Sequence, residues 1–198
     1  RRSALSISIW EGLFAQFHLM LTGGIFIYAY LQAFNPSYLQ YALLAAIPPF
    51  ALLIQLPSAH WLQHLRSRKP FTVLNSSGSR FGWLFIVIIP FTFTKSHALI
   101  AFFAVYIVLN LLMSMAGNSW RSWMADTMPA PIRGRYLSRR TMLCTIAGFI
   151  AAAGGFFYTH AKENWDQQLV GFFSPIIPNF MNHEESVVFI LCAILFGI

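Results

Sequence analysis

The length of its apolar blocks most limits what this chain can fold into. Each block holds about 20 or more residues, which matches a hydrocarbon layer of roughly 30 Å at 1.5 Å per helical residue. Only 10% of the residues are charged, whereas a soluble domain carries about 25%. Short strands of alternating apolar and polar residues, typical of outer-membrane barrels, are absent from the sequence. The sequence therefore predicts an all-α membrane protein.

Five complete spans and the beginning of a sixth can be assigned. The sixth apolar run is too short to cross a bilayer, and the chain opens on two arginines without a methionine. We therefore expect a polytopic bundle in which residues 1–198 form one domain of a longer protein, with a truncated sixth helix. The expected spans are Ile7–Phe34, Leu39–Leu62, Phe71–Phe93, Ala98–Met124 and Tyr136–Thr159, followed by Ser186–Ile198.

The distribution of basic residues predicts the orientation. Most of the 13 Lys and Arg fall at alternate ends of the spans, on one side of the membrane, while Lys95 and Lys162 fall on the other. Because positively charged loops stay in the cytoplasm, the amino terminus is expected there. The residues on the basic side are Arg1, Arg2, Arg66, Arg68, Lys69, Arg121, Arg133, Arg135, Arg139 and Arg140.

Two inner loops resemble a known family. The string WRSWMADTMPAPIRGRYLSRR, from Trp120 to Arg140, resembles the loop between helices four and five of major facilitator superfamily transporters. An acidic residue, a proline and an Arg-Gly pair recur in that loop. The matching residues here are Asp126, Pro129, Arg133 and Gly134, followed by Arg135.

The loop HWLQHLRSRKP, from His60 to Pro70, resembles the superfamily's signature between helices two and three. Arg68 and Lys69 match the basic end of that signature. Gln63 and His64 stand where an Asp-Arg pair is expected, so the chain departs from the family there.

The resemblance implies the amino-terminal half of a transporter from a bacterial subgroup of the superfamily, located in the inner membrane. Such a transporter moves a small solute by alternating access, with or without a coupled proton or ion. A second half, absent from this chain, would complete the solute site. It also implies a cytoplasmic gate formed by the matching residues of the two loops. A non-transporting membrane partner that keeps this fold is one alternative, favoured by the altered signature, and a membrane-embedded enzyme is another.

Polar residues inside the fourth span form a stripe. Asn110, Ser114, Asn118 and Arg121 are spaced by four, four and three residues, which places them on one helical face. The family's fourth helix borders the central cavity, so Asn110, Ser114 and Asn118 are candidates for lining the solute route. Hydrogen bonding between helices is an equally open interpretation, because Asn and Ser serve that role in membranes.

The first span carries Glu11, His18 and Thr22 on one face, with Gln16 beside it. The resemblance implies that His18, Thr22 and Gln16 also border the cavity. Glu11 and His18 could relay a proton, since histidine titrates near neutral pH. Alternatively, Glu11 lies at the inner interface and His18 donates to a neighbouring helix.

Arg80 lies about eleven residues into the third span, roughly 16 Å deep, where an arginine needs carbonyls, a carboxylate or water. A structural role is favoured over contact with an anionic solute. The sequence indicates no cofactor, no cluster of metal ligands and no nucleophile or phosphate-binding motif. The net charge of +7 is scattered between apolar blocks, which argues against nucleic-acid binding.

Overall fold

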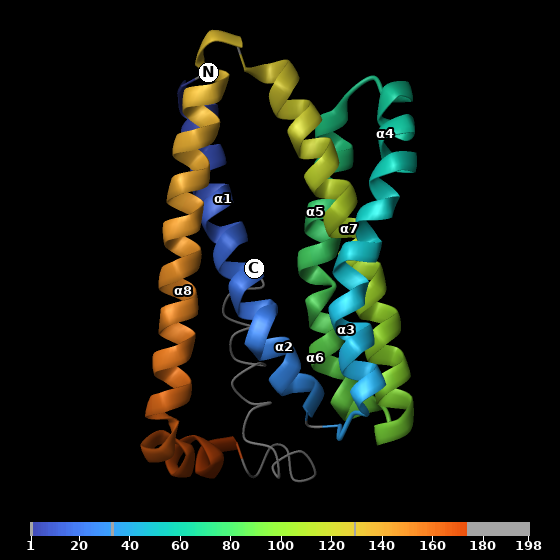
Figure 1. The fold of residues 1–198 in the computed structure, drawn as a ribbon, viewed down its shortest axis with the longest axis vertical. Coiled ribbons are helices and arrows are strands. Elements are labelled where there is room, and N and C mark those ends of the chain that lie inside the picture. The colour runs from blue at the N-terminus through green and yellow to red at the C-terminus, as the bar shows by residue number, and fades with distance from the viewer. Residues whose placement is uncertain (1, 33, 129, 174–198) are drawn as a thin grey trace. The chain divides into compact units, whose positions relative to one another are not determined.

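The computed structural model describes residues 2–32, 34–128 and 130–173, and within these it contains helices and no strand. The elements, shown in Figure 1, are α1 (Arg2–Thr22), α2 (Gly24–Gln32), α3 (Tyr38–Ala51), the 3₁₀ turn η1 (Leu52–Ile54), α4 (Gln55–His64), α5 (Arg68–Phe81), α6 (Trp83–Thr92), α7 (Lys95–Thr127) and α8 (Ala130–Phe173).

The helices divide into two compact units. Among the described residues, the first unit takes in those up to Asn35 and those from Arg135 to Phe173, and so contains α1, α2 and most of α8. The second unit, residues 36–134, contains α3 to α7 and the first residues of α8. Each unit is described separately below.

Four stretches are long and apolar enough to cross a membrane: Ser8–Gln32, Tyr38–His64, Arg68–Thr92 and His97–Thr127. They coincide with the first four predicted spans, so the prediction of an all-α chain of membrane-spanning composition is confirmed. The predicted fifth span lies within α8, which is not among the four. The predicted sixth span lies outside the described residues. The count of five complete spans and a truncated sixth therefore stays a prediction.

Glycines and prolines interrupt three of these stretches, where the sequence predicts uninterrupted spans. In the first, α1 gives way to α2 at Gly24, whose φ of 53° belongs to the left-handed region that glycine adopts freely. In the second, Pro48 and Pro49 lie inside α3, and the 3₁₀ turn η1 follows directly. Proline removes a backbone donor and crowds the carbonyl four residues earlier, which favours such a break. In the third, Gly82 separates α5 from α6.

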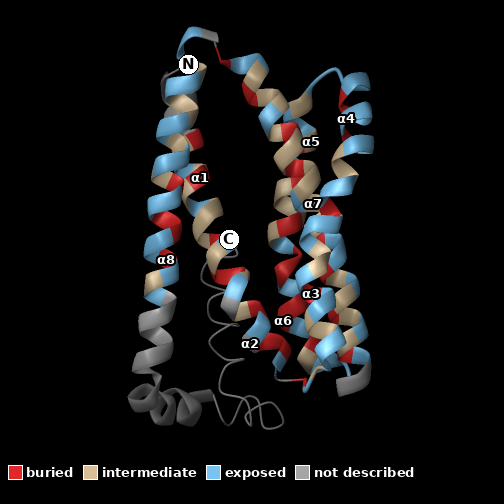
Figure 2. Cartoon of the chain, in the orientation of Figure 1, coloured by how far each residue is buried: buried red, intermediate tan, exposed pale blue. Residues whose placement is uncertain are grey.

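In the second unit, α7 is the central helix, and α5 packs against it most closely. Ile86 of α6 and Phe102 of α7 are fully buried, and the Phe102 ring stacks on Tyr106 with centroids 5.7 Å apart. The outward sides of the same helices expose large apolar residues such as Leu74, Phe85 and Ile100 (Figure 2). A surface of this kind suits contact with lipid rather than water.

Candidate functional site

An ion pair joins the segments 60–70 and 120–140, from which the sequence analysis predicted a cytoplasmic gate. Arg68 begins α5 and Asp126 stands one residue before the end of α7, and because α5 and α7 run in opposite directions these ends lie side by side (Figure 1). The Arg68 Nη1 donates to the Asp126 Oδ2, across 58 positions of sequence. The side chains are 31% and 61% exposed. Exposed pairs of this kind contribute about 0–1 kcal/mol, so the contact can be broken and remade at little cost.

Arg133 caps the end of α7. Its Nη2 donates to the carbonyl oxygens of Ala125, at 2.5 Å, and Met128, at 3.1 Å. The last carbonyls of a helix have no partners within it, and a positive charge there complements the helix dipole. The guanidinium thus ties the connection between α7 and α8 back to α7, directly beside Asp126.

The other predicted gate residues lie around this cap. Lys69, Gly134 and Arg135 are exposed, and open space surrounds the position that a Cβ on Gly134 would take. Pro129 lies outside the described residues. The structure therefore brings Arg68, Asp126 and Arg133 together at one end of the second unit.

Asn118 of the predicted stripe bonds to a neighbouring helix. Its Nδ2 donates to the Gln55 carbonyl oxygen at 3.2 Å and to the Ser58 Oγ at 2.9 Å. One turn further on, the Arg121 Nη2 donates to the Gln55 Oε1 at 3.3 Å. Asn110 instead donates to the Tyr106 carbonyl within α7, and Ser114 is half-buried.

Gln55, which the sequence analysis did not single out, is the residue at which these contacts converge. It is the first residue of α4, immediately after η1. Its carbonyl oxygen accepts from Asn118 and from the Ser58 hydroxyl, and its side chain accepts from Arg121. The sequence carried no signal for this role, because Pro48, Pro49 and Pro57 free the carbonyls four residues before them and none of those belongs to Gln55.

In the first unit, Glu11 of α1 pairs with Arg140 of α8. The Arg140 Nη2 lies 3.2 Å from the Glu11 Oε2, and its Nε donates to the Ser8 carbonyl oxygen at 3.2 Å. Arg140 is 17% exposed and Glu11 40%. The sequence analysis placed Arg140 only among the loop residues. A carboxylate inside a membrane-spanning segment usually pairs with a cation, so the presence of Glu11 was a sequence signal for a basic partner such as Arg140.

The other polar residues predicted in the first span are Gln16, His18 and Thr22, and all three lie in α1. His18 is buried, and the Thr22 Oγ1 donates to its carbonyl oxygen at 2.6 Å. The Gln16 Cγ and Nε2 lie 3.1 Å from the position that a Cβ on Gly148 would take, so this glycine admits the Gln16 side chain.

In the second unit, Arg80 is half-buried in the last turn of α5.

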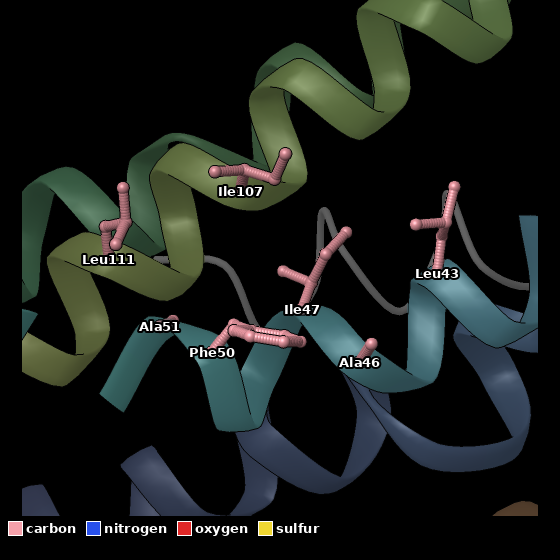
Figure 3. Close-up of a pocket in the computed structure, with 7 residues that line it drawn as sticks. All are labelled: Leu43, Ala46, Ile47, Phe50, Ala51, Ile107 and Leu111. Atoms are coloured by element: carbon pink, nitrogen blue, oxygen red, sulfur yellow. The ribbon is translucent and has the colours of Figure 1, made fainter. Parts of the chain in front are cut away.

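A groove of about 300 Å³ lies between α3 and α7 (Figure 3). Every residue that lines it is apolar, so none of the predicted polar residues contributes to it. It suits a hydrocarbon chain and offers no group for orienting a polar solute. The lining residues are Leu43, Ala46, Ile47, Phe50, Ala51, Ile107 and Leu111.

The fold and its composition place the chain in the class of helical membrane proteins. No protein-family model, curated protein or solved structure matches it. Among the described residues, no group of three or more His, Cys, Asp or Glu side chains lies close enough to hold a metal ion.

Proposed function

We propose that this chain acts as the amino-terminal half of a secondary transporter that moves a small solute across the bacterial inner membrane by alternating access. The observation that carries the proposal is the Arg68–Asp126 ion pair, because it joins the two loops whose sequences resemble the superfamily's inner-loop signatures. Its two residues come from helices that cross in opposite directions, at the end where the basic residues predict the cytoplasm.

The chemistry of this pair suits a gate. The pair is exposed, so its strength is modest and its formation depends on the local arrangement of α5 and α7. The Arg133 cap keeps the end of α7 intact while the loop changes position. A differential interaction of about 1–3 kcal/mol between inward-open and inward-closed states would shift their balance roughly five- to 150-fold.

Within the proposal, Glu11 with His18 provides the coupling site, and the polar residues of α1 and those of α7 are each candidates for contact with the solute. Arg140 bears on that role, since protonating Glu11 would remove the charge that holds the Arg140 guanidinium. A proton arriving at Glu11 would then weaken the contact between α1 and α8. Coupled transport needs such a link between protonation and helix contacts.

The transport test uses the protein produced from its complete gene, reconstituted in liposomes and supplied with a mixture of small organic solutes. We expect accumulation of at least one solute only under an imposed proton or ion gradient. Asp126→Asn should change its rate severalfold, and exchanging the charges as Arg68→Asp with Asp126→Arg should restore part of the rate. Lys69→Gln is the matched control, because it removes a neighbouring positive charge and leaves the pair intact.

Two outcomes would count against the proposal. Failure to accumulate any solute under either gradient would favour a membrane protein with another function, the alternative that the altered Gln63-His64 segment supports. Equal rates in Asp126→Asn and the parent would show that the pair holds loops in place without gating.

Orientation is tested separately by cysteine labelling in intact cells. Cysteines at Ser67 and Ala130 should react only from the cytoplasm, and cysteines at Ser37 and Asn164 only from outside. Labelling of Ser37 and Ser67 from the same side would contradict the five-crossing arrangement, whatever the protein transports.

A further inference from the structure

Two histidines lie one helical turn apart at the end of α4. His60 and His64 are both exposed, and Figure 2 colours most of α4 as exposed. Their Nε2 atoms are 3.4 Å apart, and their ring centroids are 4.8 Å apart with the planes at 80°. Side chains at positions i and i+4 lie above one another on a helix, so the backbone itself holds the imidazoles together.

We propose that His60 and His64 form a two-imidazole site for a tetrahedral divalent transition-metal ion of the Zn²⁺ type. A Zn–N bond is about 2.0–2.1 Å, so two nitrogens at a tetrahedral angle lie about 3.3–3.4 Å apart. The observed distance between the two Nε2 atoms, 3.4 Å, matches this ligand-to-ligand distance. An octahedral ion, with ligands at right angles, would need about 2.8–3.0 Å at the same bond length. The observed separation is therefore closer to a tetrahedral arrangement than to an octahedral one.

Binding requires a small rotation of each ring. In the metal-free form a hydrogen bond can join the two Nε2 atoms, with one ring protonated there and the other accepting. For chelation, each lone pair turns by about 35° from the N–N line, towards a shared point outside the helix. The terminal torsion of histidine is soft and both rings are exposed, so the rotation meets little resistance. The hydrogen bond lost is worth only about 0.5–1.5 kcal/mol.

The described residues contain no group of three His, Cys, Asp or Glu side chains, so within them the pair supplies two ligands and the remaining positions on the ion are open to water. Arg66 and Lys69 beyond the helix end are exposed, and salt screens their repulsion of the cation. A bound ion links the last two turns of α4, immediately before the connection of residues 65–67 that leads to Arg68. The site is independent of the proposed transport.

The test uses the complete chain in detergent micelles, carrying no polyhistidine tag and stripped with a chelator. Co²⁺ serves as the optical probe, because tetrahedral Co²⁺ absorbs strongly in the visible range, and Zn²⁺ is then titrated against it. We expect tetrahedral bands in the parent protein and displacement by Zn²⁺. His60→Ala and His64→Ala should each weaken Zn²⁺ binding by at least tenfold, since one imidazole cannot chelate.

His97→Ala is the matched control, an exposed histidine at the start of α7 whose loss should leave binding unchanged. Circular dichroism in the chelator should give the same helix content for all variants, which separates lost ligands from misfolding. If either single α4 variant keeps the parent's bands and affinity, the two-imidazole site is refuted. Parent protein without tetrahedral bands refutes it as well.

Discussion

The contact between α1 and α8 and the contact between α5 and α7 use different means to hold two helices together. α5 and α7 are antiparallel and packed closely, with small polar side chains between them. The Thr72 Oγ1 donates to the Ser119 Oγ at 3.0 Å, and the Ser79 Oγ lies 3.8 Å from the Met113 sulphur. We call these four residues the polar seam.

α1 and α8 instead run in the same direction (Figure 1). Long side chains of each helix lie against glycines of the other. The Arg140 guanidinium lies where a Cβ on Gly12 would stand, with Nη2 2.5 Å from that position. At the second such contact the long side chain, Gln16, belongs to α1 and the glycine, Gly148, belongs to α8. Among the described side chains, small polar groups thus join α5 to α7, whereas long side chains join α1 to α8. The first should be sensitive to added volume and the second to lost charge.

The largest effect is expected from adding volume beside the polar seam. A Cβ on Gly82 would overlap the Leu109 side chain and lie 2.9 Å from the Gly78 carbonyl oxygen. Gly82→Ala should therefore lower the free energy of unfolding by about 1–3 kcal/mol, as overpacking does. The measurement is denaturant unfolding in micelles. Gly117→Ala is the control, because nothing lies within 4 Å of its added methyl group, and it should be neutral or stabilising. Equal effects of both substitutions would contradict this view of the seam.

The second-largest loss of stability is expected from removing the ion pair between Arg140 and Glu11 in the first unit. Arg140→Ala leaves the Glu11 carboxylate and the Ser8 carbonyl without this donor. We expect a loss of about 1–2 kcal/mol, less than for a fully buried pair, because Glu11 is 40% exposed. The neighbouring exposed Arg139→Ala should change stability by less than about 0.5 kcal/mol. If the two variants melt at the same temperature, α1 and α8 are held together by other contacts.

A single hydrogen bond of the polar seam should matter less. Ser119→Ala removes the acceptor for Thr72, and side-chain hydrogen bonds between membrane helices average about 0.6 kcal/mol. We expect a loss of about 0.5–1 kcal/mol, because Thr72 keeps its bond to the Arg68 carbonyl. Ser122→Ala, at a half-buried position three residues on, provides the baseline. A loss above that of Arg140→Ala would reverse the order of the two contacts.

The smallest effect on stability is expected at the exposed ion pair. A double-mutant cycle of Arg68→Gln and Asp126→Asn should give a coupling energy of at most about 1 kcal/mol, which falls as salt is raised. The same cycle on Arg140→Gln and Glu11→Gln should give the larger and less salt-sensitive value, because Arg140 is less exposed than Arg68. Equal coupling energies would remove the distinction between the two pairs.

The sequence predicted the helical class and the positions of four spans, and these agree with the structure to within a few residues at most ends. It also predicted that Asn118 and Arg121 lie on one face of α7, and both contact Gln55. It did not predict the breaks near Pro49 and at Gly82. Membrane helices often continue through such residues, since neighbouring groups re-satisfy the backbone. Whether a helix breaks depends on those neighbours.

What the sequence by itself determined is which segments avoid water and where their charged ends fall, because transfer of apolar residues into a bilayer depends on composition and length alone. Which side chains pair was decided by tertiary structure. Asp126 could have paired with any of several arginines near it in the sequence, yet it bonds to Arg68, 58 positions away, because α5 and α7 are antiparallel. Glu11 likewise bonds to Arg140 only because α1 lies along α8. Coulomb attraction falls with distance, and the packing of helices sets those distances.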